Sequence, residues 1–189
     1  APGLLEVARE RNPHNNFLEE DLESLPFADD SFHVVTGFNS FQFASDFKAA
    51  VREAQRVLRP GGKLVIGIWD LPERSDASIV LKAIGALIPP PPPGTPGPFA
   101  LSEDGKIEGI LKEIGFKLNS KTVVACPFTY SSLTEGIRSF MGTGPAAAAM
   151  YNSTKLITED AIGRALRQFR VTEDIHFLQN HFLLFVAEK

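Results

Sequence analysis

Two apolar segments separated by an amphipathic one constrain the fold of this chain more than any other feature. Residues 32–38 and 63–69 are rich in β-branched and other apolar side chains, which is typical of buried strands. Between them, residues 46–59 place apolar side chains at helical spacing, and Pro60-Gly61-Gly62 predicts the end of that helix. A strand, a helix and a strand in this order form a βαβ unit. We therefore expect the two strands to be parallel, with a right-handed crossover.

The remaining pattern predicts further elements around this unit. Helices are expected at residues 2–11, 77–88, 102–115 and 158–169, and strands at residues 16–19, 116–125 and 176–187. Ser102 is expected to cap the third of these helices, and Ser132-x-x-Glu135 is a capping box that predicts another. No helix follows the last strand, so we expect it to run antiparallel to the others. Pro89–Pro98 holds seven of the 14 prolines and predicts a stiff connector.

Composition excludes several classes of protein. The 189 residues carry 19 Lys and Arg against 23 Asp and Glu, which argues against nucleic acid as a partner because phosphate contacts need clustered cations. No apolar run reaches the roughly 18–20 residues of a membrane span, so no membrane partner is expected. The single cysteine, Cys126, suits a reducing compartment, and we expect a cytoplasmic protein. The four histidines lack metal-ligand spacing, so no metal site is expected.

These patterns predict an α/β fold: a Rossmann-like, doubly wound, mostly parallel sheet with an antiparallel C-terminal strand, in one domain of residues 1–189. Ligands of such sheets bind outside the carboxyl ends of the strands. Three loops there carry suggestive residues: Asp21-Leu22, residues 38–43 and Trp69-Asp70. A carboxylate such as that of Asp21 can accept a hydrogen bond from an exocyclic amine. Each loop also has a structural interpretation, since Asp often caps turns and aromatic clusters are often core.

Two linked motifs make the pattern more specific. Residues 21–35 read DLESLPFADDSFHVV and residues 56–66 read RVLRPGGKLVI. At this separation they resemble the class I S-adenosylmethionine-dependent methyltransferases, and most closely the type 11 group, which includes the ubiquinone and menaquinone C-methyltransferases. The clear resemblance covers residues 1–70, and residues 107–124 fit more loosely. His33 departs from the pattern, because the family usually has Asp at that position.

The resemblance implies S-adenosyl-L-methionine as the cofactor and a small organic molecule as the methyl acceptor, at an O, N or C atom. Asp21 would contact the adenine amine with Leu22 beside it, and Asn39 and Ser40 would lie at the methionine end of the cofactor. Residues Phe41, Phe43 and Trp69 would face the substrate. Residues 71–101 and 131–171 would form a lid over an apolar pocket. No catalytic residue is identified, because methyl transfer from a sulfonium does not require a dedicated base.

The family's glycine-rich loop and the acid that holds the ribose hydroxyls both precede the helix at residues 2–11. By this resemblance, two strands and a helix are missing before Ala1, and the strand at residues 32–38 has an open hydrogen-bonding edge. Three explanations are open: a chain cut or recorded short, a partner that supplies those strands, or a module that no longer binds the cofactor. The alternative function is thus a non-catalytic module that forms a homodimer through the open edge. A nicotinamide-binding Rossmann domain is disfavoured, since the LPF and PGG motifs have no role there.

Overall fold

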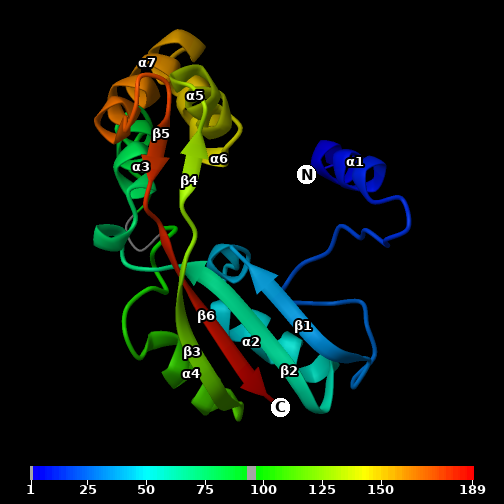
Figure 1. Ribbon diagram of the computed structural model, residues 1–189. Coiled ribbons are helices and arrows are strands. Elements are labelled where there is room, and N and C mark those ends of the chain that lie inside the picture. The colour runs from blue at the N-terminus through cyan, green and yellow to red at the C-terminus, as the bar shows by residue number, and fades with distance from the viewer. Residues whose placement is uncertain (1, 93–96) are drawn as a thin grey trace.

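One four-stranded sheet organises the chain in the computed structural model, which describes residues 2–92 and 97–189 (Figure 1). Its order is β1-β2-β6-β3, with the bounds β1 Phe32–Phe38, β2 Leu58–Trp69, β6 His181–Glu188 and β3 Lys117–Ala125. Strands β1 and β2 pair in parallel, and β6 is antiparallel to both β2 and β3. Three of the four strands therefore run in one direction. This confirms the mostly parallel sheet with an antiparallel C-terminal strand.

The predicted βαβ unit is present. Helix α2, Phe47–Val57, connects β1 to β2, and Asp46 caps it by accepting hydrogen bonds from Lys48 N at 2.8 Å and Ala49 N at 3.2 Å. The apolar stripe of α2 is buried against the sheet. The PGG turn is folded into the start of β2, where Gly61 has a φ of 76° that suits glycine.

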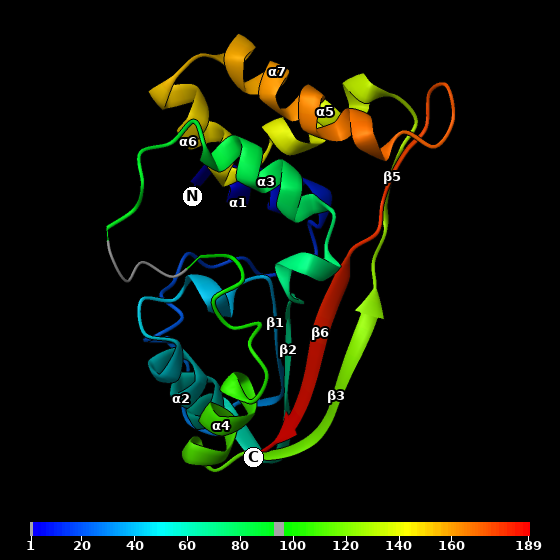
Figure 2. The same ribbon diagram turned by 90° about the vertical axis from the view of Figure 1, so that its left-hand side faces the viewer.

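Helices cover only one face of this sheet in the described residues. Figure 2 shows α2 and α4, Lys106–Ile114, on the same side of the strands, and α1, Pro2–Arg11, lies apart from the sheet. The main core lies between that face and the two helices, and its largest fully buried members are Leu58, Leu64, Ile66, Ile68, Ile107, Leu111 and Phe185. The opposite face carries Val34, Phe38 and Val124, whose side chains are exposed.

A second group of helices sits beyond the carboxyl ends of β1 and β2 (Figure 1). It comprises α3 Ala77–Gly85, α5 Leu133–Met141, α6 Gly144–Asn152 and α7 Lys155–Leu166, together with a two-stranded antiparallel sheet of β4 Phe128–Tyr130 and β5 His176–Leu178. These elements share a separate cluster of buried side chains. Short 3₁₀ helices lie at η1 Phe41–Phe43, η2 Pro72–Arg74 and η3 Arg167–Phe169. None of the helices in the described ranges is long and apolar enough to cross a membrane.

Strand β1 lies at one edge of the sheet, as expected. Asn39 N donates to Gly67 O at 2.8 Å, so the backbone groups of Gly37 and Asn39 face β2. In a strand, the backbone N–H and C=O groups of successive residues point alternately to the two sides of the strand. The N–H and C=O groups of Val34, Thr36 and Phe38 therefore point to the open side, where no strand pairs with β1 in the described part of the chain.

Three local predictions are wrong. Residues 16–19 form no strand. The helix expected from Ser102 starts only at Lys106, because Ser102 Oγ donates to Trp69 O at 2.8 Å and Gly105 turns the chain with a φ of 81°. The predicted strand 176–187 is divided into β5 and β6, and between them the buried Asn180 accepts a hydrogen bond from Ala77 N at 3.0 Å. Part of the proline-rich connector, residues 93–96, lies outside the described residues.

The core makes a simple prediction about stability. Phe185 of β6 is 1% exposed between the two helices and the sheet, whereas Phe43 of η1 is 69% exposed. We expect Phe185→Ala to lower the free energy of unfolding by about 3–5 kcal/mol, because it removes a buried ring and leaves a cavity. The matched change Phe43→Ala should cost less than about 1 kcal/mol. Urea denaturation of both variants measures the difference, and equal losses would contradict this account of the core.

Candidate functional site

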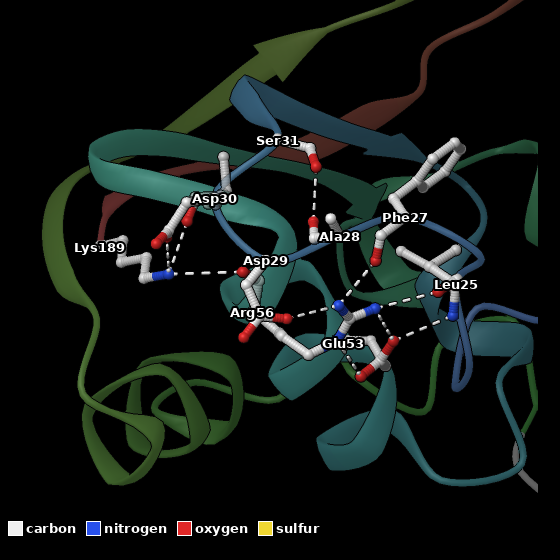
Figure 3. A network of polar contacts seen from close by, with 10 residues as sticks. Leu25, Phe27, Ala28, Asp29, Asp30, Ser31, Glu53, Arg56 and Lys189 are labelled. Atoms are coloured by element: carbon white, nitrogen blue, oxygen red, sulfur yellow. Dashed lines mark hydrogen bonds and ion pairs between the residues drawn. The ribbon is translucent and has the colours of Figure 1, made fainter.

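Hydrogen bonds to helix α2 attach the loop that carries Asp21, and the guanidinium of Arg56 makes three of these contacts (Figure 3). Arg56 Nη1 donates to the carbonyl oxygen of Phe27 at 2.7 Å and pairs with Asp29 Oδ1 at 2.8 Å, and Nη2 donates to the carbonyl oxygen of Leu25 at 3.0 Å. The loop has almost no regular secondary structure of its own. Its conformation therefore depends on contacts made by side chains of the neighbouring helix.

Glu53, one turn earlier on α2, holds this guanidinium in place. Its two carboxylate oxygens accept from Arg56 Nε and Nη2, each at 2.9 Å, and Oε2 also accepts from Leu25 N at 2.9 Å. Such a two-point contact fixes the plane of the guanidinium. The hydrogen bond from Arg56, and then that from Leu25 N, lowers the pKa of Glu53. The contacts with Glu53 and Asp29 raise the pKa of Arg56.

A pocket of about 390 Å³, which we call the acidic pocket, lies at the other end of this loop. It is lined by Glu20, Asp21, Leu22, Glu23, Phe43, Ala44 and Ser45. Asp21 Oδ1 accepts from Glu23 N at 2.9 Å, and no contact involves Oδ2 in the described residues. Glu23 Oε1 accepts from Asp46 N at 2.8 Å, which joins the loop to the start of α2. The pocket thus combines carboxylate acceptors with the apolar side chains of Leu22 and Phe43, a set that suits an aromatic ring bearing an amine.

A second, apolar pocket of about 430 Å³ lies on the face of the sheet that has no helices; we call it the aromatic pocket, and it is lined by Phe38, Asn39, Gly67, Val124, Cys126, Phe128, Phe182, Leu183 and Leu184. None of these residues is charged. Asn39, at the end of β1, has a φ of 48°, and its Oδ1 accepts from Gln42 Nε2 at 3.3 Å. This contact leaves the amide N–H groups of Asn39 to donate to a ligand.

The predicted site residues divide between these two pockets. Asp21, Leu22 and Phe43 line the acidic pocket, and Asn39 lines the aromatic pocket. Ser40 is half-buried between them, at the start of η1. Residues 39–45 therefore connect the two pockets along the carboxyl end of β1.

Two of the expected substrate contacts lie elsewhere. Phe41 is 4% exposed and packs in the main core, where its ring is 6.1 Å from that of Phe47. Trp69 packs on Phe182 with ring centroids 4.4 Å apart and also contacts Phe99 and Phe128. Trp69 thus supports a wall of the aromatic pocket, and it is not among the residues that line it. The direct contact of either residue with a substrate stays a prediction.

Sequence reasoning missed most of the aromatic pocket. Phe38 and Phe182 belong to strands that are distant in sequence, and Cys126 and Phe128 lie after a third strand. The only signal was Phe38 itself, an aromatic residue at the end of a buried strand that precedes Asn39. Residues from the other strands meet it only because of the strand order.

The comparisons with known proteins agree with this geometry. A family model described as "Methyltransferase domain" matches residues 1–66. This segment of the chain is similar to that domain family. It contains the acidic pocket, β1 and α2. It also contains the hydrogen bonds between Arg56 and the loop, so these contacts lie within the matched segment.

Curated relatives match the same part of the chain. The demethylmenaquinone methyltransferase of Renibacterium salmoninarum is 40% identical over 70 residues, which cover 37% of this chain and 30% of that protein. The malonyl-[acyl-carrier protein] O-methyltransferase of Serratia marcescens is 36% identical over 80 residues, which cover 41% of this chain and 31% of that protein. The chain therefore spans about a third of the length of the curated relatives that it matches.

Solved structures extend the similarity to the whole chain, at the level of the fold. The YcgJ protein from Bacillus subtilis superimposes with a TM-score of 0.60 at 19% identity, covering 100% of this chain and 79% of that one. The [4+2]-cyclase SpnF does so with a TM-score of 0.55 at 20% identity, covering 98% of this chain and 61% of that one. The chain thus shares the Rossmann-like α/β fold of these structures. A cyclase among these structures illustrates that the fold alone does not establish the reaction.

The contacts of Glu53 with Arg56 and the loop make a pH-dependent prediction. Since the pKa of Glu53 is lowered from its ordinary value of 4.5 in the folded protein, the charged carboxylate stabilises the fold above about pH 4.5. That contribution is lost as the pH falls through the lowered pKa. We expect Glu53→Gln to lower the free energy of unfolding by about 1–2 kcal/mol at pH 7, because a charge-assisted pair is removed. The difference from the unmodified protein should shrink steadily below about pH 4.5.

Chemical denaturation at a series of pH values measures this difference. Glu6→Gln is the matched control, because Glu6 is exposed on α1. The control should show no difference from the unmodified protein at either end of the pH range. A loss in Glu53→Gln that stays constant down to pH 3 would show that the charge of Glu53 is not what stabilises the loop.

Proposed function

We propose that the protein containing this chain transfers the methyl group of S-adenosyl-L-methionine to a small organic molecule. The acidic pocket within the segment that matches the methyltransferase family carries this proposal. The named activities of the curated relatives, which include demethylmenaquinone and malonyl-[acyl-carrier protein] methylation, support it. Because those two acceptors differ widely, the acceptor of this protein is not assigned from them.

The residues of the acidic pocket fit the adenosyl part of this cofactor. The adenine amine would donate to Asp21 Oδ2, the oxygen that the loop does not use, while Leu22 and Phe43 would contact the ring faces. Asn39 and Ser40 would then hold the methionine end, since residues 39–45 connect the two pockets. When bound, the cofactor supplies a methyl group on a positively charged sulfur. The sulfur leaves readily as a neutral thioether.

The chain's own residues would then bind and orient the cofactor and the acceptor, and they would keep water out. The helices beyond the carboxyl ends of β1 and β2, within residues 71–92, 97–101 and 131–171, would act as a lid over the acceptor. Alignment of the acceptor with the methyl group and exclusion of water contribute much of the rate in such a displacement. The acceptor atom, O, N or C, stays open, and a cytoplasmic location is part of the proposal.

Isothermal titration calorimetry with S-adenosylhomocysteine, the product form of the cofactor, tests cofactor binding. We expect binding in the micromolar range and about tenfold weaker binding by Asp21→Asn, since a hydrogen bond to a charged group contributes about 1.5 kcal/mol. Glu20→Gln removes the same charge from the same pocket and is the matched control, for which we expect a change below about twofold. Equal losses in the two variants would contradict the specific role of Asp21.

The open edge of β1 favours a second candidate function, a non-catalytic module that forms a homodimer. Three alternate residues, Val34, Thr36 and Phe38, present backbone groups with no partner strand among the described residues, and the seven residues of β1 include neither proline nor Lys or Glu. Light scattering distinguishes the two candidates when it accompanies the calorimetry. A stable dimer that fails to bind S-adenosylhomocysteine would favour this module over the enzyme.

A further inference from the structure

Gln42 is a buried amide at the carboxyl end of β1, and the proposed function as stated so far gives it no role. It is 4% exposed, although it belongs to η1, whose next residue, Phe43, is 69% exposed. Its Nε2 donates to Asn39 Oδ1 at 3.3 Å, and its Oε1 has no hydrogen-bond partner among the described residues. A buried polar atom without a partner lowers stability, so its presence here calls for a physical reason.

The packing of Phe41 determines where Gln42 lies. The ring of Phe41 enters the main core beside Gly37, where a Cβ atom would be only 2.2 Å from Cε2 of that ring. Within the same short helix, Phe43 N donates to Ser40 O at 3.0 Å. These contacts fix the backbone from which the side chain of Gln42 extends.

The backbone of Asn39 is fixed as well. Its N–H donates to Gly67 O at 2.8 Å, and its φ of 48° lies in the left-handed region, which Asn adopts more readily than most residues. The side chain of Asn39 is exposed. The hydrogen bond from Gln42 therefore determines which end of this exposed amide is free, and it leaves the N–H groups free.

The opposite orientation of the two amides is less favourable. If both were turned over, Asn39 Nδ2 would donate to Gln42 Oε1, and the NH2 group of Gln42 would occupy the buried position where the oxygen now lies. Protein interiors tolerate an unpaired carbonyl oxygen better than unpaired N–H groups. Asn39 thus presents hydrogen-bond donors at the end of β1, and the unpaired oxygen of Gln42 accompanies this arrangement.

We propose that Gln42 is a positioning residue of the cofactor site: it holds the amide of Asn39 so that its N–H groups receive the carboxylate of the methionine end. The proposal rests on the proposed function, in which Asn39 lies at that end of the cofactor. Of the two charged groups there, the carboxylate accepts hydrogen bonds and the ammonium only donates them. An amide that presents only donors therefore selects the carboxylate.

The side-chain amide signals in heteronuclear NMR test the orientation without any ligand. In the unmodified protein, the Asn39 N–H groups should exchange with solvent like an exposed amide, and the bonded N–H of Gln42 at least about tenfold more slowly. Gln42→Glu at about pH 8 replaces the donor with a carboxylate, which only accepts. The Asn39 amide should then turn over, and its exchange should slow about tenfold.

Gln55→Glu is the matched control for this measurement. Gln55 is also a partly buried amide whose Nε2 donates to an oxygen, that of Ile114 at 2.9 Å, but it lies on α2 and makes no hydrogen bond to Asn39. The control therefore loses the same donor and gains the same charge. The exchange of the Asn39 amide should stay unchanged in this variant.

Calorimetry with two adenosyl ligands tests the contact with the carboxylate. S-adenosylhomocysteine carries this group, and 5′-methylthioadenosine lacks the whole amino-acid part. We expect S-adenosylhomocysteine to bind about tenfold more weakly to Gln42→Glu, which reverses the Asn39 amide, and about threefold more weakly to the uncharged Gln42→Met, which only frees it. The affinity for 5′-methylthioadenosine should change less than about twofold in both, and Gln55→Glu should alter neither ligand's affinity.

Three results would overturn the proposal. They are unchanged exchange of the Asn39 amide in Gln42→Glu, equal weakening of the two ligands, and weakening in the charged variant alone, which would indicate repulsion and not orientation. Circular dichroism checks the folding of each variant, and the uncharged Gln42→Met keeps the test decisive if the charged one does not fold. Failure of both ligands to bind the unmodified protein would contradict the proposed function, whereas the exchange rates would still decide whether Gln42 orients Asn39.

Discussion

The contact between Arg56 and the loop of residues 21–31 is the interaction on which the candidate cofactor site depends. The loop contains almost no regular structure, and the guanidinium of Arg56 holds it by contacts with Phe27 O, Leu25 O and Asp29 (Figure 3). Glu53 fixes that guanidinium and also accepts from Leu25 N. The two motifs of the family therefore form one structural unit. In the proposed function they act indirectly, by fixing the position of Asp21 and Leu22 at the end of the loop.

The uncovered face of the sheet is the second constraint. Sheets with mainly parallel strands normally bury both faces, yet in the described residues α2 and α4 cover only one (Figure 2). The open face carries Val34, Phe38 and Val124 in exposed positions, and the open edge of β1 borders it. Apolar area left in water is unfavourable, so this face gains stability from whatever covers it. The aromatic pocket is the part of the face where the sheet, β4 and the residues that follow β1 and β3 form a concave surface.

Much of the fold followed from local pattern, and the site only in part. Helix α2 and strands β1 and β2 were predicted because the spacing of apolar side chains within each segment indicates its type. The turn residues between the segments indicate where each one ends. The start of α4 was missed because Ser102 makes a tertiary hydrogen bond to Trp69 O instead of a cap, and the break after β5 because Asn180 binds Ala77 N. No local pattern encodes such distant partners. For the same reason Asp21, which lies within a sequence motif, was predicted as a site residue, whereas Phe182 and Phe128 were not.

Two glycines on neighbouring strands explain how one sheet supports both a core and a pocket. A Cβ at residue 37 would be 2.2 Å from Cε2 of Phe41, and one at residue 67 would be 2.5 Å from Cδ1 of Phe38. Residues 37 and 67 occupy adjacent positions of the ladder, since Gly37 pairs with Ile66 and Phe38 with Gly67. The first glycine lets the ring of Phe41 enter the buried face, and the second lets the ring of Phe38 lie on the open face. Because consecutive residues of a strand point to opposite faces, Phe38 could not contribute to both. The end of β1 thus joins the stability of the fold to the shape of the binding surface.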